Sequence, residues 1–471
     1  MRLWIGVLCT LVLGCHDFDA LVRRAPHDAS VDGASDAVGE AGTDAAVDTR
    51  RVRPSFVNDA ERALAGTKSL VIPANAEAVL NVDTGVLTIG AEEQTLTHFL
   101  EDQSQGAPKL SVFPLRAWAV GKGAALRLRG AAAVAFVVQG DVEIEGVVDA
   151  SANVADLGAG GPGGASSDDD DILDDVWVMS GRPGNRQSMT NTFCGSGGGG
   201  GSNGAAGGSS GACSVGFTPL GESSAVLGAH AGKSFAAYGE WTASLVGGGA
   251  GGPAFCSGAW HVDGGGGGGA VLISASGTVT IRSSGVIDAG GAGGTALGDP
   301  AGNDDCLGDT AAGGGGGAGG TVVLEARLLE LRGSVWANGG GGGGGAGYVL
   351  SASDEGKDGT RSVEPAAGGS GSGNTIRPYQ VPNQGTYMQA SDGAAGGAGG
   401  PASHSGDMSE SVERYSGDGF YRAGGYSGGG GGGVGRIIVR TADGKLPKDG
   451  TLSPSGAPAV LVQTVDFLDE P

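Results

Sequence analysis

The chain is poor in aromatic side chains and in basic charge. Aromatics make up 5% of its 471 residues, and 28 Lys and Arg stand against 51 Asp and Glu, which gives a formal net charge of −23. Such a surface repels phosphate groups, so neither nucleic acid nor anionic lipid is expected as a partner. Proline is scarce at 18 residues while glycine reaches 100, and no Gly-X-Y period is sustained, which excludes a collagen triple helix.

The first residues carry the pattern of a bacterial lipoprotein signal. A basic Met1-Arg2 precedes an apolar stretch, Leu3 to Leu13, that is too short to span a bilayer. Gly14-Cys15 then fits the lipobox, in which signal peptidase II cuts before the cysteine and the new N-terminus is acylated. We predict a signal peptide over residues 1–14 and lipidation of Cys15, palmitate included, so that acyl chains hold the protein to the membrane. A plain secretory signal with a chance cysteine is the alternative.

The residue after Cys15 is His16 rather than Asp, which by the sorting rule of Gram-negative bacteria favours the outer membrane. The protein would face either the periplasm or the cell surface. Residues 15–67 are rich in Ala, Asp, Gly, Val and Thr without apolar periodicity, and this composition predicts a lipidated Cys followed by a disordered acidic tether.

The rest of the chain contains a repeat of short strands flanked by glycine runs. Four segments share this pattern: 133–150, 270–289, 321–338 and, in a degenerate form, 434–441. Within them, Val279 and Ile281 would point to one face and Thr280 to the other. The pattern favours an all-β fold of parallel β-helix or β-solenoid-like coils with long Gly-rich insertions, and a β-sandwich is the alternative.

This pattern divides the chain after the tether into five parts. They are the N-terminal strands and first module at 68–150, a Gly-rich insertion at 151–269, the second and third modules at 270–346, a second Gly-rich insertion at 347–427, and a C-terminal module and tail at 428–471.

The glycine runs leave two interpretations open. Six or seven consecutive glycines have no side chain to bury, and ordering them has a high entropic cost. They are either flexible surface loops or a bundle of extended helices with three residues per turn, hydrogen-bonded to one another as collagen chains are.

The cysteines that remain after signal removal and lipidation suggest disulfides. Their even number in an exported protein predicts two bridges, and pairing the first with the second and the third with the fourth closes the shortest loops. A zinc site is disfavoured because no Cys-x-x-Cys spacing occurs. The four candidates are Cys194, Cys213, Cys256 and Cys306.

An acidic run offers carboxylate ligands of the kind that calcium prefers, although such a run is more often a solvated loop. It lacks the spacing of an EF-hand, and we predict neither a metal nor another cofactor. The weak calcium candidates are Asp168, Asp169, Asp170, Asp171, Asp174 and Asp175.

Catalytic residues are sought first among carboxylates, because enzymes built on parallel β-helices usually cut polysaccharides with them. Glu143, Glu145, Asp149 and Asp288 are the candidates. Asp149 and Asp288 fall at the same place in their modules, which fits a structural ladder better than a catalytic pair. We therefore predict no catalytic residue.

The lipobox, the acidic tether and modules such as Val286-Ile287-Asp288-Ala289 followed by glycine resemble Gly-rich envelope lipoproteins of gliding soil bacteria. The composition is superficially PE-PGRS-like, but the helical N-terminal domain of that family is missing. The resemblance implies no activity. We expect a lipid-anchored, non-enzymatic cell-envelope or surface protein that is adhesive or matrix-interacting, with extracellular polysaccharide or other envelope proteins as partners and no nucleic acid. A polysaccharide lyase or hydrolase and a structural coat protein are the alternatives.

Overall fold

The computed structural model describes most of the chain from Arg51 onward. The described residues are 51–104, 107–153, 160–162, 164–165, 180–182, 186–189, 192–195, 197–211, 213–216, 223–226, 244–255, 261–296, 312–345, 353–371, 427–455 and 459–468. About 35% of the described residues lie in strands and 2% in helices.

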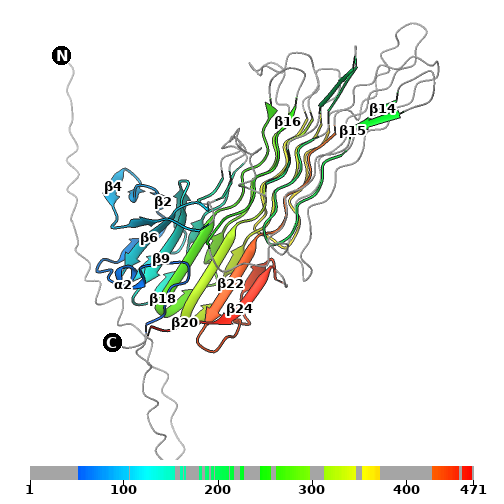
Figure 1. The fold of residues 1–471 in the computed structure, drawn as a ribbon. Coiled ribbons are helices and arrows are strands. Elements are labelled where there is room, and N and C mark those ends of the chain that lie inside the picture. Colours follow the sequence, from blue (N-terminus) through cyan, green and yellow to red (C-terminus); the bar gives the residue numbers. More distant parts are fainter. Residues whose placement is uncertain are drawn as a thin grey trace, which may run out of the picture. The chain divides into compact units, whose positions relative to one another are not determined.

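A ten-stranded sheet forms the larger layer (Figure 1), and its main path is parallel throughout. That path is β1 (Leu70–Ile72), β7 (Trp118–Val120), β10 (Val142–Ile144), β18 (Ala270–Ile281), β20 (Thr321–Leu331), β22 (Arg436–Thr441) and β24 (Val460–Thr464). The long strand β18 also pairs with β9 (Ala133–Val138), which continues to β6 (Leu110–Leu115) and β5 (Phe99–Glu101).

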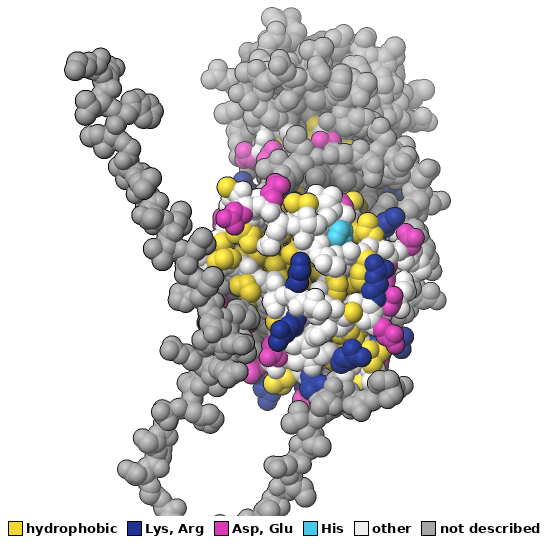
Figure 2. Space-filling model, turned by 90° about the vertical axis from the view of Figure 1, so that its left-hand side faces the viewer, with side chains coloured by type: hydrophobic (Ala, Val, Ile, Leu, Met, Phe, Trp, Pro, Cys, Tyr) yellow, Lys and Arg dark blue, Asp and Glu magenta, His cyan; other side chains and the backbone are white. Residues whose placement is uncertain are grey.

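An eight-stranded sheet forms the second layer. Its order is β23 (Thr451–Ser453), β21 (Ser334–Trp336), β19 (Val286–Asp288), β11 (Val147–Asp149), β8 (Ala125–Arg129), β2 (Glu77–Asn81), β3 (Val86–Ile89) and β4 (Glu92–Thr95). Figure 2 views the strands from the side on which β2, β4 and α2 (Ala60–Ala63) lie in Figure 1, and Lys and Arg side chains are spread there among apolar ones.

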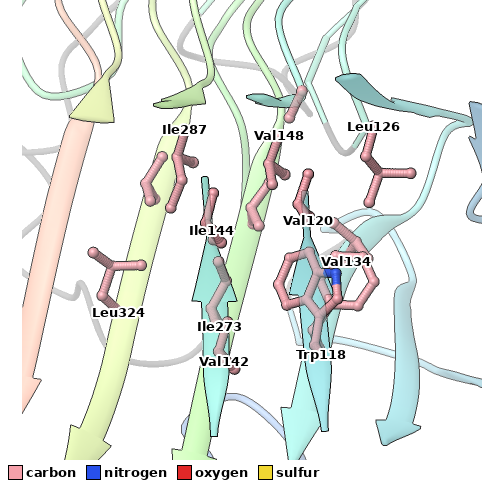
Figure 3. Close-up of a cluster of buried hydrophobic side chains, with 14 of the residues drawn as sticks. Trp118, Val120, Leu126, Val134, Val142, Ile144, Val148, Ile273, Ile287 and Leu324 are labelled. Atoms are coloured by element: carbon pink, nitrogen blue, oxygen red, sulfur yellow. The ribbon is translucent and has the colours of Figure 1, made fainter. Parts of the chain in front are cut away.

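Equivalent positions of the sequence modules lie side by side in the sheets. Val279 of the second module pairs with Val142 of the first and with Leu329 of the third, and all three side chains are buried. The alternating apolar residues thus face a core between the layers. In Figure 3, Val142, Ile144, Ile273 and Leu324 point into this core from three neighbouring strands, with Ile287 and Val148 from the second layer.

The expectation of plain β-solenoid coils was wrong, because the sheets mix parallel and antiparallel pairs and one sheet curls into a half-barrel. β2, β3 and β4 form an antiparallel meander, and β5 pairs antiparallel with β6. Gly85 (φ 71°) and Gly90 (φ 59°) adopt the left-handed conformation at the two meander turns, which glycine adopts without strain. A β-sandwich does not describe the chain either, since the stacked modules pair in parallel.

A short N-terminal segment covers the outer face of the ten-stranded sheet. Residues 51–59 are here called the strap. They run from Phe467, shortly after β24, which Val52 bridges, to Glu101 of β5, which accepts from the Asn58 and Asp59 amides, and α2 follows. Val57, Ala63 and Leu64 join an outer apolar cluster with side chains from β6, β9, β18, β20 and β22. Residues 51–67 of the segment 15–67 that the sequence predicts as a tether are therefore folded.

Three small hairpins complete the described elements: β12–β13 (Arg186–Met189, Thr192–Gly195), β14–β15 (Cys213–Gly216, Ser223–Val226) and β16–β17 (Ala254–Phe255, His261–Val262). Within the described part of the chain, no helix is long and apolar enough to cross a membrane.

Candidate functional site: a bundle of glycine segments

Glycine segments continue from the ends of the strands. Residues 264–269, 312–320 and 427–435 lead into β18, β20 and β22, whereas 289–296 and 337–345 leave β19 and β21. Figure 1 shows these extended segments running side by side beyond the strands. Together with 197–211, 244–252 and 353–371 they are called the glycine bundle below.

Segment 312–320 lies at the centre of this bundle and has hydrogen-bonded neighbours on all sides. The amides of Gly313, Gly316 and Gly319, three residues apart, donate to carbonyls at 427, 430 and 433 over 2.8 to 3.1 Å. The amides at 314, 317 and 320 donate to segment 289–296, and those at 315 and 318 to segment 244–252. Its carbonyls accept from segments 197–211, 264–269 and 337–345. A period of three is that of a helix with three residues per turn.

This arrangement resolves the question that the glycine runs left open. A helix of this kind makes no internal hydrogen bonds, so buried peptide groups need partners from neighbouring chains. The described glycine segments have such partners, and all of them except the largely exposed segment 353–371 are buried rather than exposed as surface loops. The bundle is therefore an ordered part of the fold.

Close packing explains why the residue is glycine. A Cβ atom on Gly317 or Gly267 would lie within 3.0 Å of a carbonyl group of the adjacent segment, at Gly266 and Gly248 respectively. Ala292 and Ala318 are fully buried in the same bundle, so single positions accept a methyl group where others do not. Backbones this close leave no room for larger side chains.

Segment 197–211 enters the bundle, turns back at 202–206 and leaves it again. At the turn, Asn203 Nδ2 donates to the Gly319 carbonyl at 2.8 Å and to Thr321 Oγ1 at 3.3 Å. The Gly204 amide donates to the Val434 carbonyl at 2.9 Å. These bonds fix the turn next to the beginnings of β20 and β22.

Segment 353–371 turns back in the same way at 360–364. Arg361 Nε lies 2.6 Å from Asp288 Oδ2, and its terminal nitrogen lies 3.7 Å from Asp149 Oδ2. Asn338 Nδ2 donates to the carbonyls of Thr360 and Ser362, at 2.7 Å each. The turn is thereby fixed to β11 and β19 of the eight-stranded sheet.

The carboxylates of Asp149 and Asp288 lie in register on adjacent strands, as their equivalent places in the modules predict. The Asp288 side chain is 5% exposed and also accepts a bond from the Gly290 amide. Burial raises the pKa of Asp288 above its usual value, and the Arg361 guanidinium partly opposes that increase. Sequence reasoning missed Arg361, because an arginine within a long insertion gives no signal of its contact.

The other candidate carboxylates lie elsewhere. Glu143 belongs to β10 in the ten-stranded sheet and forms an ion pair with Arg282 at 2.7 Å, and Glu145 directly follows that strand. The structure therefore does not bring the four candidate carboxylates together in one site.

A second buried ion pair lies beneath the strap. Glu325 of β20 is 1% exposed and accepts from Arg440 of β22 at 2.8 Å and from the Ser55 amide at 3.0 Å. Arg440 also contacts Ser55 Oγ and donates to Gln463 at 2.9 Å, and the Phe56 ring lies over its guanidinium. This cluster fixes the strap on the outer face of the sheet.

The remaining predicted sites are not tested by the described part of the chain. Cys15, Cys256, Cys306 and the calcium candidates Asp168 to Asp175 lie outside it, and of Cys194 and Cys213 only the backbone is described, in β13 and β14. Within the described ranges, no three His, Cys, Asp or Glu side chains gather where they could hold a metal ion.

Comparison with protein-family models, with curated proteins and with solved structures finds no match. The arguments for function consequently rest on the chain's own residues and geometry.

Proposed function

We propose that this protein is a lipid-anchored, non-enzymatic component of the bacterial outer membrane, whose glycine bundle holds long insertions away from the strands for adhesion to extracellular polysaccharide or to other envelope proteins. The observation that carries the proposal is the alternating direction of the bundle segments. The segments that lead into β18, β20 and β22 begin at the end of the bundle far from the strands. The segments that leave β19 and β21 end at that same far end.

The described residues that flank the insertions 297–311, 346–352 and 372–426 consequently lie at one end of the bundle. Segment ends are bonded to one another there, such as Thr295 to Asp263 and Gly313 to Ser427. A multiply hydrogen-bonded bundle is stiffer than a single glycine chain, which would be a flexible coil. It therefore suits a spacer that carries several loops at a common place.

The composition of two insertions supports a binding role. Tyrosine is favoured at recognition surfaces, because a rigid ring gives a large contact area at low entropic cost and its hydroxyl makes hydrogen bonds. Six of the chain's seven tyrosines lie in the insertions 346–352 and 372–426: Tyr348, Tyr379, Tyr387, Tyr415, Tyr421 and Tyr426.

The test uses the chain from His16 onward, which is soluble if the acyl chains are the membrane anchor, and a panel of envelope and matrix polysaccharides. Retention on a glycan without new reducing or unsaturated ends supports adhesion. Ends released above a boiled control overturn the non-enzymatic assignment, and neither retention nor release favours a structural coat.

A matched variant tests whether the binding depends on the insertion 372–426. Replacing residues 372–426 with a Gly-Ser linker of equal length should abolish retention, while amide exchange in segment 312–320 stays unchanged. Retention at the level of the parent chain would contradict a role for this insertion. Metabolic labelling with palmitate, compared between the full precursor and Cys15→Ser, tests the anchor separately.

A further inference from the structure

The last strand of the ten-stranded sheet, β24, has a free edge. Among the described strands it pairs with β22 alone, and it ends the path of the sheet. The bonds from Ile437 to the Ala459 carbonyl and from Val465 to the Thr441 carbonyl show that odd-numbered residues face β22. The backbone groups of Val460, Val462 and Thr464 therefore point outward, and no strand in the described part of the chain pairs with them.

The other ends of the sheets are protected in ways that β24 is not. The four residues of β4 are all exposed and include Glu92 and Glu93, and β1, β5 and β23 are each only three residues long. Charged or very short edge strands discourage pairing with another chain. The side chains of β24 read Val-Leu-Val-Gln-Thr, without charge or proline, and four of the five are half-buried.

We propose that two copies of this chain pair edge to edge through β24. A symmetric pair of one strand with itself is necessarily antiparallel, and with all five residues paired Val462 faces Val462 of the second copy. The chain has a net charge of −23, yet this pairing brings no like charges opposite each other, because the strand is uncharged.

The strap shows that this side of the chain accepts an antiparallel partner. The Arg53 amide donates to the Asp466 carbonyl at 2.8 Å, and the Leu468 amide donates to the Arg51 carbonyl at 2.9 Å. Between them, Val52 and Phe467 form an antiparallel bridge. On the β24 side these bonds use Asp466 and Leu468, which lie shortly after the strand. Their even numbers place their backbone groups on the outward edge. The strap then turns onto the face of the sheet at Ser55 and leaves the edge of residues 460–464 open.

The experiment is sedimentation velocity of the chain from His16 onward, which includes the whole compact unit 50–471, over a range of concentrations. We expect a reversible monomer–dimer equilibrium. Val462→Pro removes only an outward amide and should lower the association constant about tenfold or more. Val462→Lys keeps every backbone group but places two ammonium groups opposite each other, and should have the same effect.

Val71→Pro is the matched control, because Val71 is the outward residue of β1 at the opposite edge of the same sheet. It should leave the association constant unchanged. Far-UV circular dichroism and the urea midpoint identify variants that fail to fold, and Val462→Lys decides the matter if Val462→Pro is one of them. A chain that stays monomeric at all concentrations, variants that dimerise like the parent chain, or an equal loss in Val71→Pro would each overturn the proposal.

Discussion

Arg361 and Asp288 form a 2.6 Å ion pair across 73 residues of sequence, and this pair joins the turn of a glycine segment to the eight-stranded sheet. Arg361→Ala should destabilise the fold by about 1–2 kcal/mol, because it leaves a buried carboxylate without its cation while the arginine itself is partly exposed. Urea unfolding measures the change. Arg332→Ala is the control, since Arg332 makes only a half-exposed 3.9 Å contact with Glu330, and its midpoint should stay within error of the parent chain.

Asp288 should make stability depend on pH in a defined direction. Burial raises its pKa in the folded chain above the ordinary value of 3.8, so the folded state binds the proton more tightly than the unfolded state. Its contribution is most favourable below 3.8 and is lost as pH rises through the higher folded pKa. The free energy of unfolding of the parent chain, relative to that of Asp288→Asn, should therefore increase as the pH falls from 7 to 4. A difference that is constant or shrinks over this interval would contradict the raised pKa.

Glycine at the centre of the bundle should not tolerate a methyl group. In Gly317→Ala the added Cβ meets the Gly266 carbonyl, and we expect a loss of about 1–3 kcal/mol from overpacking. Gly290→Ala is the control within the same bundle, because its nearest neighbour would be 3.2 Å away and a small shift relieves the contact. Urea midpoints compare the two variants, and equal losses would argue against close packing as the cause.

Amide exchange should distinguish the bundle from an exposed loop. The amides at 265, 315, 316 and 318 are bonded to neighbouring segments, and we expect them to be protected for minutes to hours. The largely exposed residues 446–450 are the internal reference and should exchange at once. Immediate exchange in segments 264–269 and 312–320 would show that the glycine runs are loops.

The Glu325–Arg440 ion pair beneath the strap should stabilise the fold more than an ion pair on the surface does. Glu325→Ala leaves Arg440 without its carboxylate in a mostly buried place, so we expect a loss of about 3 kcal/mol. Adding Arg440→Ala should then cost much less than it does in the parent chain, because the two side chains act together. Additive losses in this double-mutant cycle, measured by urea unfolding, would show that they are not coupled.

The part of the fold that the sequence predicts is the part that depends on periodicity. Alternation in 270–289 and 321–338 places Val279 and Leu329 on one buried face, and they do pair in register. The meander of β2, β3 and β4 escaped prediction, because it depends on left-handed turns at Gly85 and Gly90, single glycines in a chain that has 100. Among the candidate residues, the equivalence of Asp149 and Asp288 was visible from the repeat, whereas Arg361 was not.

The alternation of apolar residues, the places where glycine replaces every side chain and the excess of acidic over basic residues all follow from the sequence alone. What the glycine runs do depends on the tertiary structure. A run of glycines has no side chain to indicate a partner, and its helix makes no internal hydrogen bond, so its order depends on neighbours that lie far away in the sequence. Segment 312–320 acquires those neighbours when the strands before and after each run stack in register and bring the runs side by side.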